Sequence, residues 1–176
     1  MADRLAPDRL AIRPAVETDL AGLEWDGEYR RYRPVFRRAF EEMQQGRRIL
    51  LVATAGGAIV GQVFIQLWSA ETQYADGISR GYLYALRVRP GWQKQGLGTQ
   101  LIAAAEEALR ARGYRTAVIA AGKDNSGALR LYERLGYGII AEDPGVWYFH
   151  DVNGQQQSVE EPCWVMEKSL DVKPEA

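Results

Sequence analysis

The stretch LRVRPGWQKQGLGTQL, from Leu86 to Leu101, decides the fold of this chain. An apolar strand ends in a proline turn, and a QxxGxG element made by Gln93, Gly96 and Gly98 then opens a helix. Two glycines leave room for an anion near the backbone, and the free amides at a helix start point outward at the positive end of the helix dipole. The pattern predicts a phosphate-binding loop, although glycine pairs of this kind also occur in structural turns.

Two well-known phosphate loops do not match this pattern. A Walker loop requires GxxxxGK[ST], but Gly91 is followed five residues later by Gly96 and then Leu97, so the lysine and the hydroxyl are missing. A dinucleotide fingerprint requires a third small residue where this chain has Leu101, and an acidic residue after the next strand, which ends in VIAAG. Both nucleotide hydrolase and dinucleotide-binding functions are therefore disfavoured.

The composition is that of an ordinary globular protein. The chain has 176 residues, 47% of them hydrophobic and 26% charged, with a formal net charge of -1. We expect one domain over 1–176 with its core at about 9–170, and nothing in the overall charge indicates nucleic acid. A single Cys163 and a single His150 leave no cluster for a metal site, so no metal is predicted. Neither a signal peptide nor a run of about 18 apolar residues is recognised, which predicts a cytoplasmic protein without a membrane span.

Periodicity and turn signals predict an alternation of strands and helices. Helices are expected from Thr18 or Asp19 into Leu23, over 26–45 with a break at Pro34, after Gly98, and from about 124 to 135. Strands are expected at 9–13, 49–54, 58–68, 81–88, 116–121, 137–141 and 163–170. The strands at 49–54 and 58–68 form a hairpin, whereas 81–88 and 116–121 flank a helix and run parallel. Residues 142–162 are expected to form an extra hairpin or a long loop.

A second motif follows the predicted phosphate loop. The segment NSGALRLYERLGY begins with Asn125 at a helix start, carries Tyr132 seven residues later and ends on a glycine-tyrosine pair. Together with VxPxxQxxGxG, which begins at Val88, it resembles the signature of the GNAT superfamily of N-acetyltransferases. The likeness extends over about 9–170. It implies an α/β fold whose mixed, mostly antiparallel sheet contains a central parallel strand pair.

The resemblance implies where acetyl-coenzyme A, the co-substrate, is held. The diphosphate is received by the backbone amides of Lys94, Gln95, Gly96, Leu97, Gly98 and Thr99, and Gln93 shapes the loop. The strand containing Leu86 and Val88 splays from the strand ending near Ala121, the pantetheine arm lies in the gap, and the Val88 amide bonds the thioester carbonyl. Asn125 either bonds the pantetheine or holds the helix start.

Tyr132 is the predicted catalytic acid. With Ala128, Leu129 and Leu135 at helical spacing, an isolated tyrosine at this position is by default a core residue. Inside the double motif, we expect it instead to give its proton to the departing thiolate. A free tyrosine has a pKa of about 10, so the hydroxyl is protonated at neutral pH.

The general base and the acceptor amine are not identified by the sequence. Relatives that acetylate histones or the N-termini of ribosomal proteins carry glutamates where this chain has Tyr82 and Ala120, which disfavours both substrate classes. By strand alternation, Tyr82 and Tyr84 share a face with Leu86 and Val88, and they either line the acceptor pocket or pack in the core. His150 is a candidate base or an exposed loop residue.

Charged segments point to acceptors of opposite sign. The basic and aromatic segment YRRYRPVFRR at 29–38 suggests nucleic acid, a phosphate-bearing ligand or the solvated face of a helix. Five tail carboxylates favour a cationic amine: Glu142, Asp143, Asp151, Glu160 and Glu161. We predict an N-acetyltransferase acting by direct amine attack on a small-molecule or peptide amine, with no nucleic-acid or membrane partner and a homodimer as a candidate assembly. A non-catalytic coenzyme-binding module and a nucleic-acid interaction protein are the alternatives.

Overall fold

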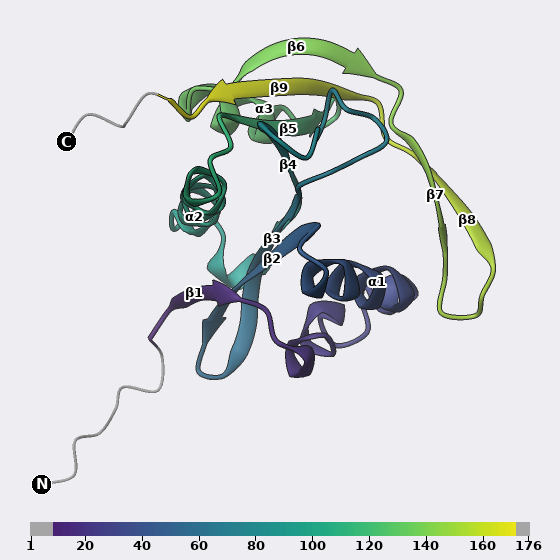
Figure 1. Ribbon diagram of the computed structural model, residues 1–176. Helices are drawn as coiled ribbons and strands as arrows, with labels where there is room; N and C mark the ends of the chain where they lie inside the picture. The colour runs from purple at the N-terminus through teal and green to yellow at the C-terminus, as the bar shows by residue number, and fades with distance from the viewer. Residues whose placement is uncertain (1–8, 172–176) are drawn as a thin grey trace, which may run out of the picture.

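The computed structural model describes residues 9–171 and is built around a seven-stranded sheet (Figure 1). The strand order is β1-β2-β3-β4-β5-β9-β6, and β7 and β8 form a separate two-stranded sheet. The strands are β1 (Ala11–Pro14), β2 (Arg48–Ala55), β3 (Ala58–Gln66), β4 (Arg80–Val88), β5 (Thr116–Gly122), β6 (Gly138–Asp143), β7 (Val146–His150), β8 (Gln156–Glu160) and β9 (Cys163–Ser169).

The sheet is mixed and mostly antiparallel, as predicted. Strands β4 and β5 are parallel, with Arg80 opposite Thr116 and Leu83 opposite Ile119. The other paired neighbours in this sheet are antiparallel, including the predicted β2–β3 hairpin. The α/β fold with a central parallel strand pair is therefore confirmed.

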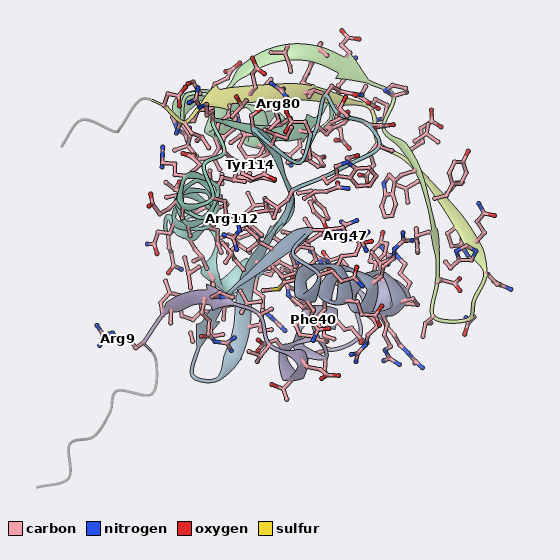
Figure 2. The ribbon with its side chains drawn as sticks, viewed as in Figure 1. Arg9, Phe40, Arg47, Arg80, Arg112 and Tyr114 are labelled. Atoms are coloured by element: carbon pink, nitrogen blue, oxygen red, sulfur yellow. The ribbon has the colours of Figure 1, made fainter. Side chains whose placement is uncertain are left out.

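Helices cover both faces of the sheet. The α-helices are α1 (Arg33–Gln44), α2 (Leu97–Ala111) and α3 (Ser126–Arg134), and the short 3-10 helices are Glu17–Asp19, Gly22–Glu24, Arg30–Tyr32 and Pro90–Trp92. One cluster of buried side chains joins α2 and α3 to the sheet, and a second joins α1, through Phe36 and Phe40, to the opposite face. Side chains fill the space between these helices and the strands (Figure 2).

The predicted helix after Thr18 is wrong, because two 3-10 turns occupy this segment. The Asp19 carboxylate accepts the Val16 amide at 2.7 Å and a guanidinium hydrogen bond from Arg13 at the same distance. Trp25 then adopts a left-handed conformation with φ 47°, which ends the second turn. Local side-chain bonds have replaced the helical ladder.

The segment 26–45 is predicted to form a kinked or a paired helix with a break at Pro34; the structure has two successive helices, but the break comes before Pro34. Pro34 lies in the first turn of α1, where a missing N–H group costs no intrahelical hydrogen bond. The residues before it form the short helix Arg30–Tyr32 rather than a first half of a kinked helix.

The segment 142–162 forms the hairpin that was one of its two expected structures. Strands β7 and β8 leave the main sheet and run beside α1 (Figure 1). Asp151 closes the turn between them, since its carboxylate accepts the amides of Asn153 and Gln155 at 2.9 Å each. This hairpin places the aromatic side chains of Trp147 and Phe149 against Tyr32, beside α1.

No helix within residues 9–171 combines the length and the apolar character needed to cross a bilayer. Most of the N-terminal stretch considered for a signal peptide, 1–8, lies outside the described residues, as does 172–176.

Candidate functional site

A gap between β4 and β5 forms the centre of the site. The two strands pair only as far as Leu83 and Ile119, although each continues for several residues beyond that point. A pocket of about 950 Å³ is lined from one side of the gap by Leu86 and from the other by Ala121. The splayed parallel pair therefore provides a cleft in the middle of the sheet.

A β-bulge in β4 shapes one wall of this cleft. Gln62 of β3 is opposite Arg87, but Phe64 is opposite Tyr84, so two residues of β4 face one residue of β3. Ala85 takes the left-handed conformation with φ 52°, and its carbonyl accepts a hydrogen bond from Gln62 Nε2 at 3.3 Å. An extra residue of this kind inverts the alternation of side chains along the strand.

The bulge overturns one prediction. Leu86 and Val88 pack into the cluster beneath α2, whereas Tyr84 packs against the cluster beneath α1. The expectation that Tyr82 and Tyr84 share a face with Leu86 and Val88 is wrong, because strict alternation does not pass through the bulge at Ala85.

The loop before α2 presents a row of backbone amides. Lys94 and Gly96 are left-handed, with φ 60° and 82°, and α2 begins at the next residue. Within residues 9–171, the amides from Lys94 to Thr99 have no hydrogen-bond acceptor, and Gln100 is the first to bond back, to the Gly96 carbonyl at 3.0 Å. A Cβ atom added to Gly98 would meet only Leu131, at 4.0 Å. The donors and the space suit an anion.

Glutamine side chains hold this loop in shape. Gln93 Nε2 donates to the Val88 carbonyl at 2.9 Å and so ties the loop to the end of β4. Gln95 Nε2 donates to the Gly91 carbonyl at 3.2 Å. The hydrogen bond to the Val88 carbonyl is the contact through which Gln93 can shape the loop.

Helix α3 contributes Asn125 and Tyr132 to the pocket. Asn125 Oδ1 accepts the Ala128 amide at 3.0 Å, so of its two predicted roles the structure shows the helix cap. Tyr132 is 7% exposed, and this burial raises the pKa of its hydroxyl to about 12. The hydroxyl is a neutral donor throughout the physiological range.

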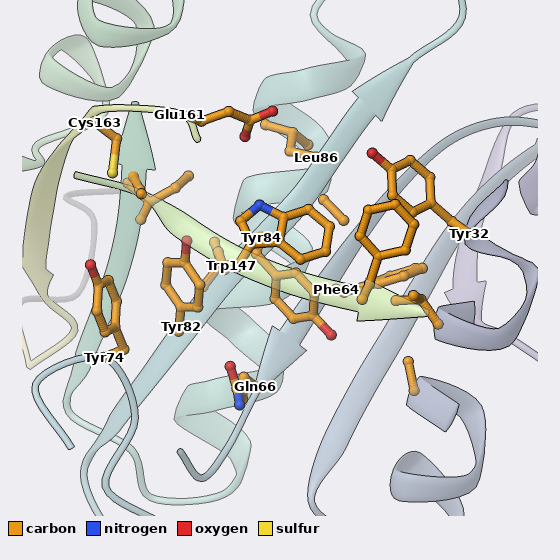
Figure 3. A pocket seen from close by; sticks show the side chains of 18 of the residues that line it. Tyr32, Phe64, Gln66, Tyr74, Tyr82, Tyr84, Leu86, Trp147, Glu161 and Cys163 are labelled. Atoms are coloured by element: carbon orange, nitrogen blue, oxygen red, sulfur yellow. The ribbon is translucent and has the colours of Figure 1, made fainter. Parts of the chain in front are cut away.

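A row of tyrosines, made by Tyr74, Tyr82 and Tyr84, lines the pocket (Figure 3). The ring centroids of Tyr74 and Tyr82 are 4.9 Å apart, and those of Tyr82 and Tyr84 are 5.7 Å apart. Tyr84 accepts a hydrogen bond from Arg48, and Tyr74 donates one to Asp143. Burial raises the pKa of each of the three hydroxyls, so all three are neutral. Tyr82 and Tyr84 thus both line the pocket.

The β7–β8 hairpin forms an aromatic wall that the sequence did not assign to a site. Trp147 and Phe149 lie 6.1 Å and 4.8 Å from the ring of Tyr32 on the α1 side, measured between centroids. Cys163 and Glu161 line the same pocket where β9 begins, and burial raises the pKa of the Cys163 thiol. These residues come from distant segments without a shared motif, so periodicity gave no signal for them.

Three of the five arginines in the basic segment at 29–38 form ion pairs at the surface. Arg33 bonds Glu24 at 2.8 Å, Arg37 bonds Glu17 at 2.9 Å and Arg38 bonds Glu42 at 3.1 Å. These pairs fit the solvated-face interpretation. His150 lines the pocket from an exposed position. Among residues 9–171, no three histidine, cysteine or carboxylate side chains gather as a metal ion would require.

Comparison with solved structures places this architecture among the acetyltransferase-type α/β folds. A Salmonella typhimurium protein solved with its cofactor acetyl-CoA superposes with a TM-score of 0.70 and 19% identity, over 96% of this chain and 98% of that one. The model of the acetyltransferase (GNAT) family matches residues 18–137. The chain belongs to this family.

Two curated relatives share part of the sequence. Mycothiol acetyltransferase from Cellulomonas flavigena is 33% identical over 95 residues, which are 53% of this chain and 27% of that protein. L-methionine sulfoximine/L-methionine sulfone acetyltransferase from Pseudomonas paraeruginosa is 30% identical over 103 residues, 58% of each chain. The match therefore spans about a quarter of the first relative and little more than half of the second.

Proposed function

We propose that this chain, as a single acetyltransferase domain, moves an acetyl group from acetyl-CoA to the primary amine of a small molecule or peptide by direct attack in a ternary complex. The observation that carries the proposal is the row of free amides at Lys94–Thr99, in a loop that Gln93 ties to the end of β4, the strand that forms one wall of the cleft that Tyr132 borders. The names of the two curated relatives, both acetyltransferases, support the same reaction type.

The coenzyme half of the site comprises residues 93–99, the cleft and Tyr132. The amides of Lys94 to Thr99 would hold the diphosphate, because a fixed row of N–H donors binds phosphate oxygens without ordering any side chain. Leu86 and Val88 would border the pantetheine arm. The Val88 amide is the proposed donor to the thioester oxygen, where charge develops during amine attack.

The acetyl transfer requires two proton movements. The amine nitrogen attacks the thioester carbonyl, the C–N bond forms, and the C–S bond breaks to release the coenzyme thiolate. Tyr132, whose pKa is raised to about 12, would donate its proton to that thiolate. A weak acid of this kind assists departure but is not indispensable, since a thiol with a pKa of about 8.5 already forms a fair leaving group.

The amine must lose a proton to attack. Of the carboxylates lining the pocket, Asp143 already accepts hydrogen bonds from Tyr74 and from the Gly145 amide. Glu71 and Glu161 also line the pocket, and Figure 3 shows the Glu161 carboxylate on the side of Leu86, which borders the β4–β5 cleft. Glu161, reached directly or through water, is therefore the proposed proton acceptor.

A thiol-release assay with acetyl-CoA and a panel of primary amines tests the proposal. We expect release that depends on the amine, together with a product heavier by one acetyl group in mass spectrometry. Tight coenzyme binding without amine-dependent release for any member of the panel would favour a non-catalytic coenzyme-binding module instead.

A further inference from the structure

Arg87 is an unneutralised cation on the pocket wall. It follows the bulge in β4 and lines the pocket, yet among residues 9–171 no carboxylate lies within 4.0 Å of its guanidinium. The other two arginines that line the pocket, Arg38 and Arg48, are both paired with Glu42. Arg87 is thus distinguished by its lack of a counter-ion.

The guanidinium of Arg87 is packed against aromatic rings. Its central carbon lies 3.7 Å from the ring centroid of Tyr29. The ring centroids of Trp25 and Phe36 are farther away, at 5.6 Å and 5.5 Å. Stacking of this kind fixes the plane of the group while leaving its N–H donors available. A planar fork with free donors is suited to a carboxylate.

Buried polar atoms without partners gather around the same group. In the described part of the chain they are Arg87 Nε, Gln62 Oε1 and Trp25 Nε1. Gln62, 0% exposed, is the strand partner of Arg87, and the Trp25 ring, 7% exposed, stacks near its guanidinium. Clustered unsatisfied groups are uncommon in native proteins and call for a ligand or water.

The bulge explains why this cation faces the acceptor side. Because alternation is inverted at Ala85, Arg87 projects to the α1 face together with Tyr84, and away from the α2 face occupied by Leu86 and Val88. Arg87 Nε is buried, so the charge is held in a poorly solvated place, and this burial lowers the pKa of the group. A buried charge without a partner is costly, and an anionic ligand removes that cost.

We infer that the acceptor carries a carboxylate as well as its amine, and that Arg87 binds this carboxylate while the aromatic wall of Tyr32, Tyr84 and Trp147 covers the apolar body of the molecule. This inference rests on the proposed acetyl-transfer function. The class of substrate is a small amino-carboxylic acid.

The acidic residues on the β6–β9 side of the pocket fit such a molecule. Asp143 and Glu161 line the pocket where β6 ends and β9 begins. Tyr132 also lines the pocket and contributes to the raised pKa of Tyr82. A molecule with its carboxylate at Arg87 directs its ammonium end toward these acids and the cleft. Opposite charges at the two ends thus set a single orientation.

Paired probes test this inference. Phenylalanine and phenylalaninamide are offered as acceptors, and the ratio of their kcat/KM values is compared between the native chain and Arg87→Met, so that differences in amine reactivity cancel. We expect the ratio to fall by about tenfold or more in the variant, because a charge-assisted hydrogen bond has been lost. Loss of packing alone would lower both kcat/KM values and leave the ratio unchanged, which would overturn the inference.

A direct binding measurement tests the same inference without requiring turnover. Calorimetric titration with 3-phenylpropionate and its carboxamide should show preference for the carboxylate in the native chain and none in Arg87→Met. Arg38→Met removes the same charge from the same pocket and should keep the preference; an equal loss there would refute a specific role for Arg87. If no amine of the panel is acetylated while the carboxylate still binds through Arg87, the acetyl-transfer function fails and the carboxylate site stands.

Discussion

The two proposed halves of the site, one for the coenzyme and one for the acceptor, are built in different ways. The coenzyme half presents backbone amides from one continuous segment, Lys94–Thr99, fixed by a left-handed glycine and the start of α2. The acceptor half, made by Tyr32, Tyr74, Tyr82, Tyr84, Arg87 and Trp147, presents side chains from separate elements. A backbone cradle tolerates many side chains and serves one constant ligand, whereas an assembled wall can change residue by residue and select among acceptors.

Substitution of Gly98 gives the largest expected effect on the coenzyme half. Gly98→Val fills the space beside the amides while meeting only Leu131 in the protein, at 4.0 Å from the new Cβ. We expect acetyl-CoA affinity to fall about a hundredfold, since several charge-assisted hydrogen bonds are lost, with folding stability retained. Calorimetric titration measures the change.

Gly138→Val is the matched control, because Gly138 begins edge strand β6 and its added Cβ meets nothing within 4 Å. Its coenzyme affinity should stay at the native value. Native affinity in Gly98→Val as well would remove the phosphate assignment from this loop.

Removal of the Tyr132 hydroxyl tests the junction of the two halves. Tyr132→Phe should lower kcat about tenfold with coenzyme affinity nearly unchanged, because the proton donor is lost and the cradle is not. Tyr114→Phe, whose hydroxyl donates to the Leu67 carbonyl at 3.2 Å outside the pocket lining, should leave kcat unchanged. Equal kcat in Tyr132→Phe and the native chain would return Tyr132 to a packing role.

Gln93 tests whether loop shape matters to the cradle. Gln93→Ala removes the hydrogen bond to the Val88 carbonyl, and a neutral hydrogen bond is worth about 1 kcal/mol, so coenzyme affinity should fall about fivefold. Gln100→Ala, on the exposed surface of α2, provides the control. A larger effect on acceptor KM than on coenzyme affinity would contradict the division into halves.

Substitution of Asp76 tests the acceptor half alone, because it should change the free energy of unfolding and the acceptor KM. Burial opposes ionisation of this carboxyl, but hydrogen bonds from the amides of Arg80, Ser79 and Ile78 hold its pKa well below the usual range. Asp76→Ala should cost about 1 kcal/mol at neutral pH, measured by urea unfolding, because the hydrogen bonds to its carboxylate are lost. It should also raise acceptor KM, because the loop before β4 carries Tyr74.

The pH dependence of this effect has a definite sign. Because the folded-state pKa of Asp76 is depressed, its contribution is present above the unfolded value of about 3.9 and is lost as the pH falls through the folded value. The difference between native chain and variant should therefore shrink below about pH 4. A difference that stayed constant as the pH fell from about 4 to about 2, or a change in coenzyme affinity, would refute the assignment.

The free amides and the capped helix of the proposed coenzyme half could be predicted because the sequence information for them is local. The QxxGxG element with the following helix, and Asn125 with Tyr132, lie at fixed spacings within short segments, so residue type alone indicates free amides and a capped helix. The parallel β4–β5 pair followed from the crossover helix between the two strands.

The acceptor half was only partly open to prediction. The bulge at Ala85 has no strong sequence signal, since alanine seldom adopts a positive φ, and one extra residue reverses which side chains face the pocket. Alternation therefore placed Leu86 on the wrong face and gave no reason to select Arg87. Trp147 reaches Tyr32 only through tertiary packing of the hairpin on α1, which periodicity does not encode.

A crystal structure with coenzyme A is the most direct test of the backbone cradle. We expect diphosphate oxygens within about 3 Å of backbone nitrogens in Lys94–Thr99, and the thiol in the β4–β5 cleft facing Tyr132. A coenzyme whose diphosphate is held elsewhere, or whose thiol lies outside the cleft, would contradict the assignment of both halves.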